Sequence, residues 1–178
     1  MSRVFWGTNP NLNYAVNRLN TNTNFLSDLI NGILGGNGQN APNASVERAV
    51  QWAIDKASNN YITYSQSNRN LKNPDGLSYD CSSFIITAFD YAGFDINATY
   101  TGNMVSGFTA AGWKWIPGNP WYSSELQRGD ILLNIANHTQ MYIGDNQDVN
   151  CGSTPARVQA HSIDYYGIPW DGILRYDR

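Results

Sequence analysis

Residues 129–151 read GDILLNIANHTQMYIGDNQDVNC, and the pattern of this stretch decides the fold class. Apolar and polar side chains alternate over residues 138–143, as they do in a half-buried β-strand. The run Gly144-Asp145-Asn146 is typical of a tight turn. A second strand is expected over residues 147–151. We therefore predict an antiparallel hairpin that begins at His138.

The segments on either side of this hairpin complete the architecture. Further strands are expected over residues 131–135, 157–161 and 173–176. Upstream, apolar residues recur at helical spacing over residues 45–60 and 81–92, and a shorter helix is expected over residues 103–111. Residues 61–64 are expected to be extended, and residues 65–79 to form a polar loop. Helices followed by a run of strands indicate an α+β fold, with helices packed on an antiparallel sheet of about five to six strands.

The first 43 residues differ in composition from the rest. They hold nearly half of the asparagines and a glycine-rich run over residues 32–38. We interpret residues 1–43 as an N-terminal arm or linker, and residues 44–178 as the folded domain. A chain of 178 residues has the size of one ordinary domain with a small appendage.

Composition and charge exclude several classes of function. The net charge is −3, so the chain lacks the basic surface with which proteins neutralise nucleic-acid phosphates. A membrane span is not expected, because no run of apolar residues is long enough. The start also lacks the apolar run of a secretory signal.

Cys81 is the first candidate for chemistry, because it opens the clearest helix of the chain. A thiol at a helix start meets the positive end of the helix dipole, which predicts a lowered pKa and a reactive thiolate. The second cysteine, Cys151, is expected to lie on a strand. The cytosol keeps thiols reduced, so a cytosolic origin disfavours a disulfide between Cys81 and Cys151.

A nucleophilic cysteine needs a base, and the chain has two histidines. His138 starts a strand whose other face suits the core, whereas His161 closes a polar strand and is interpreted as a surface or hydrogen-bonded residue. Asn150, on the next strand, is the candidate that accepts the second ring N–H of His138, at about 3 Å. Metal binding is not expected, because the histidines and cysteines include no close-spaced ligand pair.

Three ordered blocks resemble a known superfamily. They are residues 79–83 (YDCSS), 126–132 (LQRGDIL) and 138–144 (HTQMYIG), and they are similar to blocks of the NlpC-type and CHAP-type papain-like peptidoglycan hydrolases. The first block and the C-terminal run over residues 170–176 (WDGILRY) most resemble phage endolysin amidases. The resemblance covers residues 45–178.

The resemblance implies a mechanism. Cys81 would be the nucleophile, His138 the general base and Asn150 the third polar residue, where many members have histidine. The reaction would be amide hydrolysis through an acyl-enzyme, with no metal or organic cofactor. The implied partner is bacterial peptidoglycan, together with other virion tail or wall-targeting domains. The implied location is the host cytoplasm before release to the cell wall, or a phage virion tail.

Further roles follow from the same resemblance. Asp80 and Ser82 match residues that in some endopeptidase members hold the free amine of the stem peptide. Tyr64 matches a tyrosine that supports the oxyanion site. Gln140 stands where most members have glycine, so it would narrow the cleft or add a hydrogen bond to the substrate. The Gly129-Asp130 turn is expected to be structural.

Several alternatives stay open at the level of sequence. An amidase would cut between the muramic acid lactyl group and L-alanine, whereas an endopeptidase would cut within the stem peptide or cross-bridge. A non-catalytic wall-binding or virion structural module, and an acyl transferase of the transglutaminase type, are the alternatives from other classes. The host, and the choice between lysis and the start of infection, are not specified by the residues.

Overall fold

A computed structural model describes residues 44–58, 62–120 and 122–176. The predicted N-terminal arm, residues 1–43, lies outside the described residues. Within them, no helix is both long and apolar enough to cross a membrane.

Three α-helices precede most of the sheet: α2 (Ala44–Ala57), α3 (Cys81–Tyr91) and α4 (Thr101–Ala110). All three were predicted, with boundaries that differ by a few residues. The helix α3 ends at Ala92, and Gly93 follows with a positive φ of 95°, a conformation that glycine adopts without strain. The short 3₁₀ helix η1 (Ser123–Glu125) lies before the central strands.

A six-stranded antiparallel sheet forms the other half of the domain, in the order β3-β10-β4-β5-β6-β7. The strands are β3 (Lys114–Pro117), β4 (Ile131–Asn134), β5 (His138–Gly144), β6 (Gln147–Asn150), β7 (Arg157–Ala160) and β10 (Gly172–Arg175). The α+β fold class is therefore confirmed. The edge strand β3 was not predicted, because it is short and mostly exposed and so carries no alternating pattern.

Two small strand pairs complete the described strands, and of these only Thr63–Tyr64 lies in a segment that was predicted to be extended. The parallel pair β1 (Thr63–Tyr64) and β2 (Ser78–Tyr79) lies beside the start of α3, and the antiparallel pair β8 (Asp164–Tyr165) and β9 (Ile168–Pro169) follows β7. Each of these strands has two residues, too few to show a period. The predicted polar loop over residues 65–79 was therefore wrong at its end, where β2 forms.

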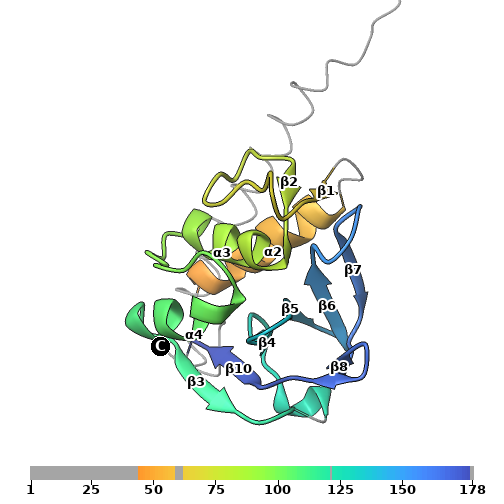
Figure 1. The fold of residues 1–178 in the computed structure, drawn as a ribbon. Coiled ribbons are helices and arrows are strands. Elements are labelled where there is room, and N and C mark those ends of the chain that lie inside the picture. The colour runs from red at the N-terminus through yellow and green to blue at the C-terminus, as the bar shows by residue number, and fades with distance from the viewer. Residues whose placement is uncertain (1–43, 59–61, 121, 177–178) are drawn as a thin grey trace, which may run out of the picture. The chain divides into compact units, whose positions relative to one another are not determined.

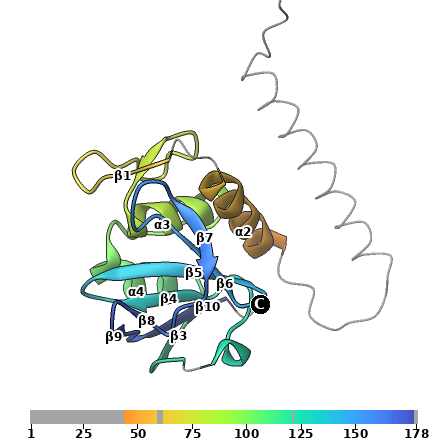
Figure 2. The ribbon, with the colours of Figure 1, turned by 90° about the vertical axis from the view of Figure 1, so that its right-hand side faces the viewer.

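The sheet lies between two layers of unequal size. Figures 1 and 2 show α2 and α3 on one face of β4, β5 and β6, and Figure 2 shows β8 and β9 on the other side of these strands. Met141 and Val149 face the helices and belong to the main core, together with Phe84 of α3. On the opposite face a smaller cluster contains Tyr142 and Trp170.

The hairpin of β5 and β6 forms as predicted. Its turn has positive φ values at Gly144, Asp145 and Asn146, the conformation of the turns that match the twist of paired strands. Met141 pairs with Val149, and Tyr142 with Asp148. His138, Gln140 and Asp148 therefore share the face of the sheet that lies away from α3.

The turn at Gly129-Asp130 has the structural role that was expected. Gly129 has a φ of 92°, and a Cβ there would lie 2.2 Å from a methyl carbon of Val46. Asp130 forms an ion pair with Arg175 of β10, with 2.9 Å between Arg175 Nε and Asp130 Oδ1. The turn thus joins the first helix to the end of the sheet.

Candidate active site

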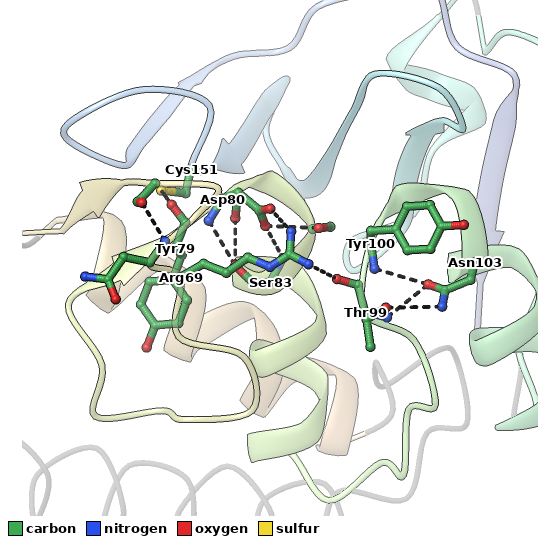
Figure 3. A network of polar contacts seen from close by, with 11 residues as sticks. Arg69, Tyr79, Asp80, Ser83, Thr99, Tyr100, Asn103 and Cys151 are labelled. Carbon is green, nitrogen blue, oxygen red and sulfur yellow. Dashed lines mark hydrogen bonds and ion pairs between the residues drawn. The ribbon is translucent and has the colours of Figure 1, made fainter.

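The site begins at the N-terminus of α3, where Asp80 caps the helix. Its Oδ1 accepts a hydrogen bond from the backbone N–H of Ser83 at 2.7 Å, and Ser83 Oγ accepts one from the N–H of Asp80 at 2.9 Å. This reciprocal arrangement satisfies N–H groups that a helix start leaves without partners. Cys81 is therefore fixed as the first residue of the helix (Figure 3 shows this region).

Arg69 contacts the second carboxylate oxygen of Asp80, Oδ2. Its Nη1 forms an ion pair with Asp80 Oδ2, and its Nη2 donates to the carbonyl of Thr99 at 2.8 Å, as Figure 3 shows. Ser82 Oγ donates to Asp80 Oδ1 at 3.0 Å. Asp80 and Ser82 are both buried, and both carboxylate oxygens of Asp80 have partners inside the protein. Their role in holding a substrate amine stays a prediction.

The thiol of Cys81 is protonated in this environment. Burial raises its pKa to about 11, and the negative charge of Asp80 raises it further, while N–H groups of Thr139, Ser82 and Cys81 itself act in the opposite direction. The lowered pKa predicted from the helix start is therefore wrong for this structure. Desolvation of the thiolate outweighs the helix N-terminus.

His138 stands at the start of β5, one residue before the strand contact with the thiol. The backbone N–H of Thr139, the residue that follows it, interacts with the sulfur of Cys81. The His138 side chain is buried, and burial lowers its pKa to about 4. At neutral pH the candidate nucleophile is therefore a neutral thiol and the candidate base a neutral imidazole.

Aromatic rings hold the imidazole of His138. The ring of Tyr165 stacks on the imidazole, with ring centroids 4.1 Å apart and an angle of 16° between the planes. The ring of Trp170 is tilted by 33° to the imidazole, with centroids 6.1 Å apart. Among the described residues, no group hydrogen-bonds to either ring nitrogen of His138, and none joins it directly to Cys81. Catalytic hydrogen bonds are often long in free enzymes and tighten when the substrate binds.

Asn150 lies on the same face as His138 but makes other contacts. Its Nδ2 donates to Gln140 Oε1 at 3.4 Å, and its Oδ1 accepts from the N–H of Gly152 at 2.9 Å. A Cβ on Gly152 would lie 3.0 Å from Cε1 of His138 and 3.1 Å from Oδ1 of Asn150. The two side chains are thus neighbours across a glycine, without the hydrogen bond that the sequence predicts. The role of Asn150 stays a prediction.

Gln140 connects this site to a buried hydrogen-bonded pair, Asp148 and His161. Its Nε2 donates to Asp148 Oδ2 at 2.7 Å, and the same oxygen lies 2.8 Å from Nδ1 of His161. Both amide ends of Gln140 are therefore used within the protein. His161 is hydrogen-bonded, as the sequence analysis allowed, but its side chain is only 3% exposed, so a surface position is wrong.

Removal of His161 is expected to destabilise the fold. His161→Ala removes one of the three hydrogen-bond partners of Asp148 Oδ2 and leaves only Gln140 Nε2 and the N–H of Ser162 on this fully buried carboxylate. Losing a buried hydrogen bond to a carboxylate costs about 2 kcal/mol of unfolding free energy. Denaturant unfolding measures the loss. His161→Asn, whose amide can replace the Nδ1 donor, is the matched control and should lose much less; equal stability of the alanine variant and the parent would contradict the role of this pair.

Tyr64 lies on β1, which pairs with β2 just before Cys81. Burial raises the pKa of Tyr64, and the negative charge of a Cys81 thiolate raises it further. The phenol of Tyr64 is therefore close enough to the thiol to sense its charge. Burial raises the pKa of Tyr165 as well, and the charge of a Cys81 thiolate raises it further.

A cavity of about 320 Å³ opens beside this site. Three of the residues predicted from the sequence line it: His138, Gln140 and Asn150. The rest of the wall comes from β7 and from the segment that contains β8 and β9: Gly152, Arg157, Gln159, Ser162, Asp164, Tyr165 and Tyr166. The cavity is thus a polar pocket that ends at the imidazole.

Sequence reasoning missed Tyr165 and Arg69. Tyr165 is one of eleven tyrosines and lies 27 positions after His138 in the chain, so no local pattern links the two. Arg69 lies in the loop that precedes β2, and only the folded loop brings it to Asp80. No group of three or more histidine, cysteine or acidic residues that could hold a metal ion occurs in the described part of the chain.

The profile of the endolysin-like domain family matches residues 39–149, which is more than half of the chain. The chain belongs to the endolysin-like domain family. Cys81 and His138 lie within the matched residues of this endolysin-like domain, whereas Asn150 and the β7–β9 wall of the cavity lie just beyond them. No curated protein matches the chain.

Solved structures similar to this endolysin-like domain share the NlpC/P60-type papain-like fold. The peptidoglycan hydrolase RipB from Mycobacterium tuberculosis is 20% identical, with a TM-score of 0.53, over 97% of this chain and 92% of that one. The P60 domain of an antigen from Mycobacterium avium subspecies paratuberculosis is 18% identical, with a TM-score of 0.51, over 74% and 96%. A variant of the resuscitation promoting factor interacting protein RipA, changed at a cysteine, is 21% identical, with a TM-score of 0.52, over 79% and 68%. Further similar structures are RipA variants changed at a histidine and at a glutamate.

Proposed function

We propose that this endolysin-like domain is a cysteine peptidoglycan hydrolase, with Cys81 as nucleophile and His138 as general base. The observation that carries the proposal is the meeting of the α3 N-terminus with the start of β5, where the N–H of Thr139 interacts with the Cys81 sulfur. Family membership and the likeness to RipB, a peptidoglycan hydrolase, support this substrate.

The charge states of the two groups suggest how the reaction starts. Neutral His138 takes the proton of the Cys81 thiol as the sulfur attacks the amide carbonyl, and then gives this proton to the leaving amine. A water molecule, deprotonated by the same imidazole, hydrolyses the acyl-enzyme. The N–H groups of Cys81 and Ser82 interact with the sulfur, which supports a role for them, together with the Tyr64 phenol, in stabilising the oxyanion of the intermediate.

The spacing between His138 and Asn150 in the sequence favours Asn150 as the third polar residue of the site. The histidine and the glutamate changed in the RipA variants are separated in sequence by the same number of residues as His138 and Asn150. In the free protein, however, stacking with Tyr165 and not a hydrogen bond orients the imidazole. We infer that Tyr165 positions His138, and that Asn150 acts through the Gln140 contact or engages His138 only with substrate bound.

Substitution of Tyr165 tests this inference. Tyr165→Phe keeps the stacked ring and should retain most activity, whereas Tyr165→Leu should lower kcat about tenfold or more, because small misplacements of a catalytic group are costly. The leucine variant also uncovers His138, so the acid limb of its pH profile should move upward from about 4. If Asn150→Ala loses more activity than Tyr165→Leu and the acid limb stays in place, the ring is not the positioning group.

The scissile bond is most consistent with an N-acetylmuramoyl-L-alanine amidase. The endopeptidases of the resembling family that need a free amine would use Asp80, but here both of its oxygens are engaged, one by Arg69. An amidase acts on a stem peptide whose N-terminus is still joined to the lactyl group, so it has no amine to recognise. The family also supports a role in bacteriophage lysis, with the enzyme reaching the wall from the host cytoplasm.

Digestion of purified cell wall distinguishes the two bonds. An amidase releases stem peptides with a new N-terminal L-alanine and leaves lactyl carboxylates on the glycan, which mass spectrometry identifies. New amino ends on any other residue would assign an endopeptidase instead. The Arg69→Gln variant adds a specific test: by freeing Asp80 it should increase binding of stem peptides that carry a free amine.

A further inference from the structure

The cavity beside His138 contains a cation without a protein counter-ion. Arg157 begins β7 and its side chain is exposed. Its backbone pairs with Asn150 of β6, so the two side chains share the face of the sheet that carries His138. Among the described residues, Arg157 forms no ion pair or hydrogen bond through its guanidinium.

In the described residues, no carboxylate of the wall forms an ion pair with Arg157. Asp164 also lines the cavity, but its Oδ1 accepts the N–H of Gly167 at 2.9 Å and so shapes the turn between β8 and β9. Gln159 lies two residues after Arg157 on β7, and in the described structure its amide has no partner. The pocket therefore offers a guanidinium and an uncommitted amide on one wall.

This combination fits a carboxylate. The planar guanidinium can bind both oxygens of a carboxylate at once, and an amide N–H can bind a remaining lone pair. The stem peptide of peptidoglycan carries such groups close to its amide bonds. Its glutamate is linked through the side-chain carboxyl, which leaves the α-carboxylate free, and a diaminopimelate residue carries a second free carboxylate.

We propose that the cavity beside His138 binds a free carboxylate of the substrate's stem peptide, with Arg157 as its counter-ion and Gln159 as a further donor. The proposal rests on the proposed function, because it places the peptide next to the bond that His138 helps to cut. It makes Arg157 a residue that determines specificity, and it predicts that amidation of the wall peptide weakens recognition.

Binding of synthetic muropeptides to the Cys81→Ala variant tests the proposal. Three peptides are compared by calorimetry: one with both carboxylates free, one with the glutamate α-carboxylate amidated, and one with the diaminopimelate carboxylate amidated. Amidation of the recognised group should weaken binding about tenfold, the effect of losing one charge-assisted hydrogen-bonded pair. The amidated peptide whose binding is weakened shows whether the recognised carboxylate belongs to glutamate or to diaminopimelate.

Variants of Arg157 provide the matched comparison. In the Arg157→Gln protein the three peptides should bind alike, at the affinity of the amidated peptide, while Arg157→Lys should keep part of the preference. Unchanged thermal unfolding verifies that the exposed substitution leaves the fold intact. The proposal is overturned if amidation has no effect on the parent, or if Arg157→Gln weakens all three peptides by the same factor.

The two proposals fail in different ways. If the protein with Cys81 intact cleaves neither cell wall nor muropeptides, the hydrolase function is wrong, although the binding comparison still decides the role of Arg157. If cleavage occurs without any preference for a free carboxylate, the function stands and the carboxylate pocket is rejected.

Discussion

Cys81→Ala is expected to abolish cell-wall hydrolysis while the fold stays intact. Loss of the nucleophile from a coupled pair removes roughly 10⁴–10⁶ in rate, because the remaining groups can only bind and polarise the substrate. Release of soluble peptide from purified wall measures the loss. Circular dichroism verifies the fold, since the small change at the start of α3 leaves the Asp80 cap in place.

Cys151 provides the control for this result. Its side chain is fully buried, its Sγ lies 3.4 Å from the carbonyl of Tyr79, and burial raises its pKa to about 12. A thiol in this position has no base and no access to substrate, so Cys151→Ser should keep most activity. The assignment would be reversed if the Cys151 variant were inactive and the Cys81 variant turned over within tenfold of the parent.

His138→Ala should be as inactive as Cys81→Ala, because a thiol with a pKa of about 11 needs a base before it can attack. The pH dependence of the parent enzyme provides a second, quantitative test of His138. Burial lowers the pKa of His138 to about 4, so the imidazole is neutral, and able to accept the proton, at every pH above that value. Activity is lost as the pH falls through this value and His138 becomes charged.

The pH dependence of kcat/KM on a soluble muropeptide measures this signature. The profile should rise near pH 4 and stay flat through neutral pH, up to the range where Cys81 ionises. An exposed histidine would instead place the rise near its ordinary value of about 6.5. A midpoint at or above that value would mean that His138 is not buried in the active enzyme, or that another base acts.

Local patterns were sufficient for most of the architecture. The helices α2 and α3, the turn at Gly144-Asp145-Asn146 and five of the six strands of the main sheet were predicted from apolar periodicity, caps and turn residues. These signals act within a few residues of each other, so they can be read from the sequence directly. The strands that were missed, β3, β2, β8 and β9, pair with segments outside their own few residues and are too short to show a period.

The sequence by itself determined that a cysteine opens a helix, that a histidine starts a strand, and that helices precede an antiparallel sheet. The tertiary structure decided the electrostatic state and the surroundings of these groups. Burial and Asp80 raise the pKa of Cys81 where the helix start alone predicts a lower one. Arg69 takes the carboxylate that was predicted to bind substrate, and Tyr165 stacks on the imidazole where Asn150 was expected to hydrogen-bond. Each of these outcomes depends on desolvation and on contacts between segments far apart in the chain, and neither quantity is a property of any local stretch of sequence.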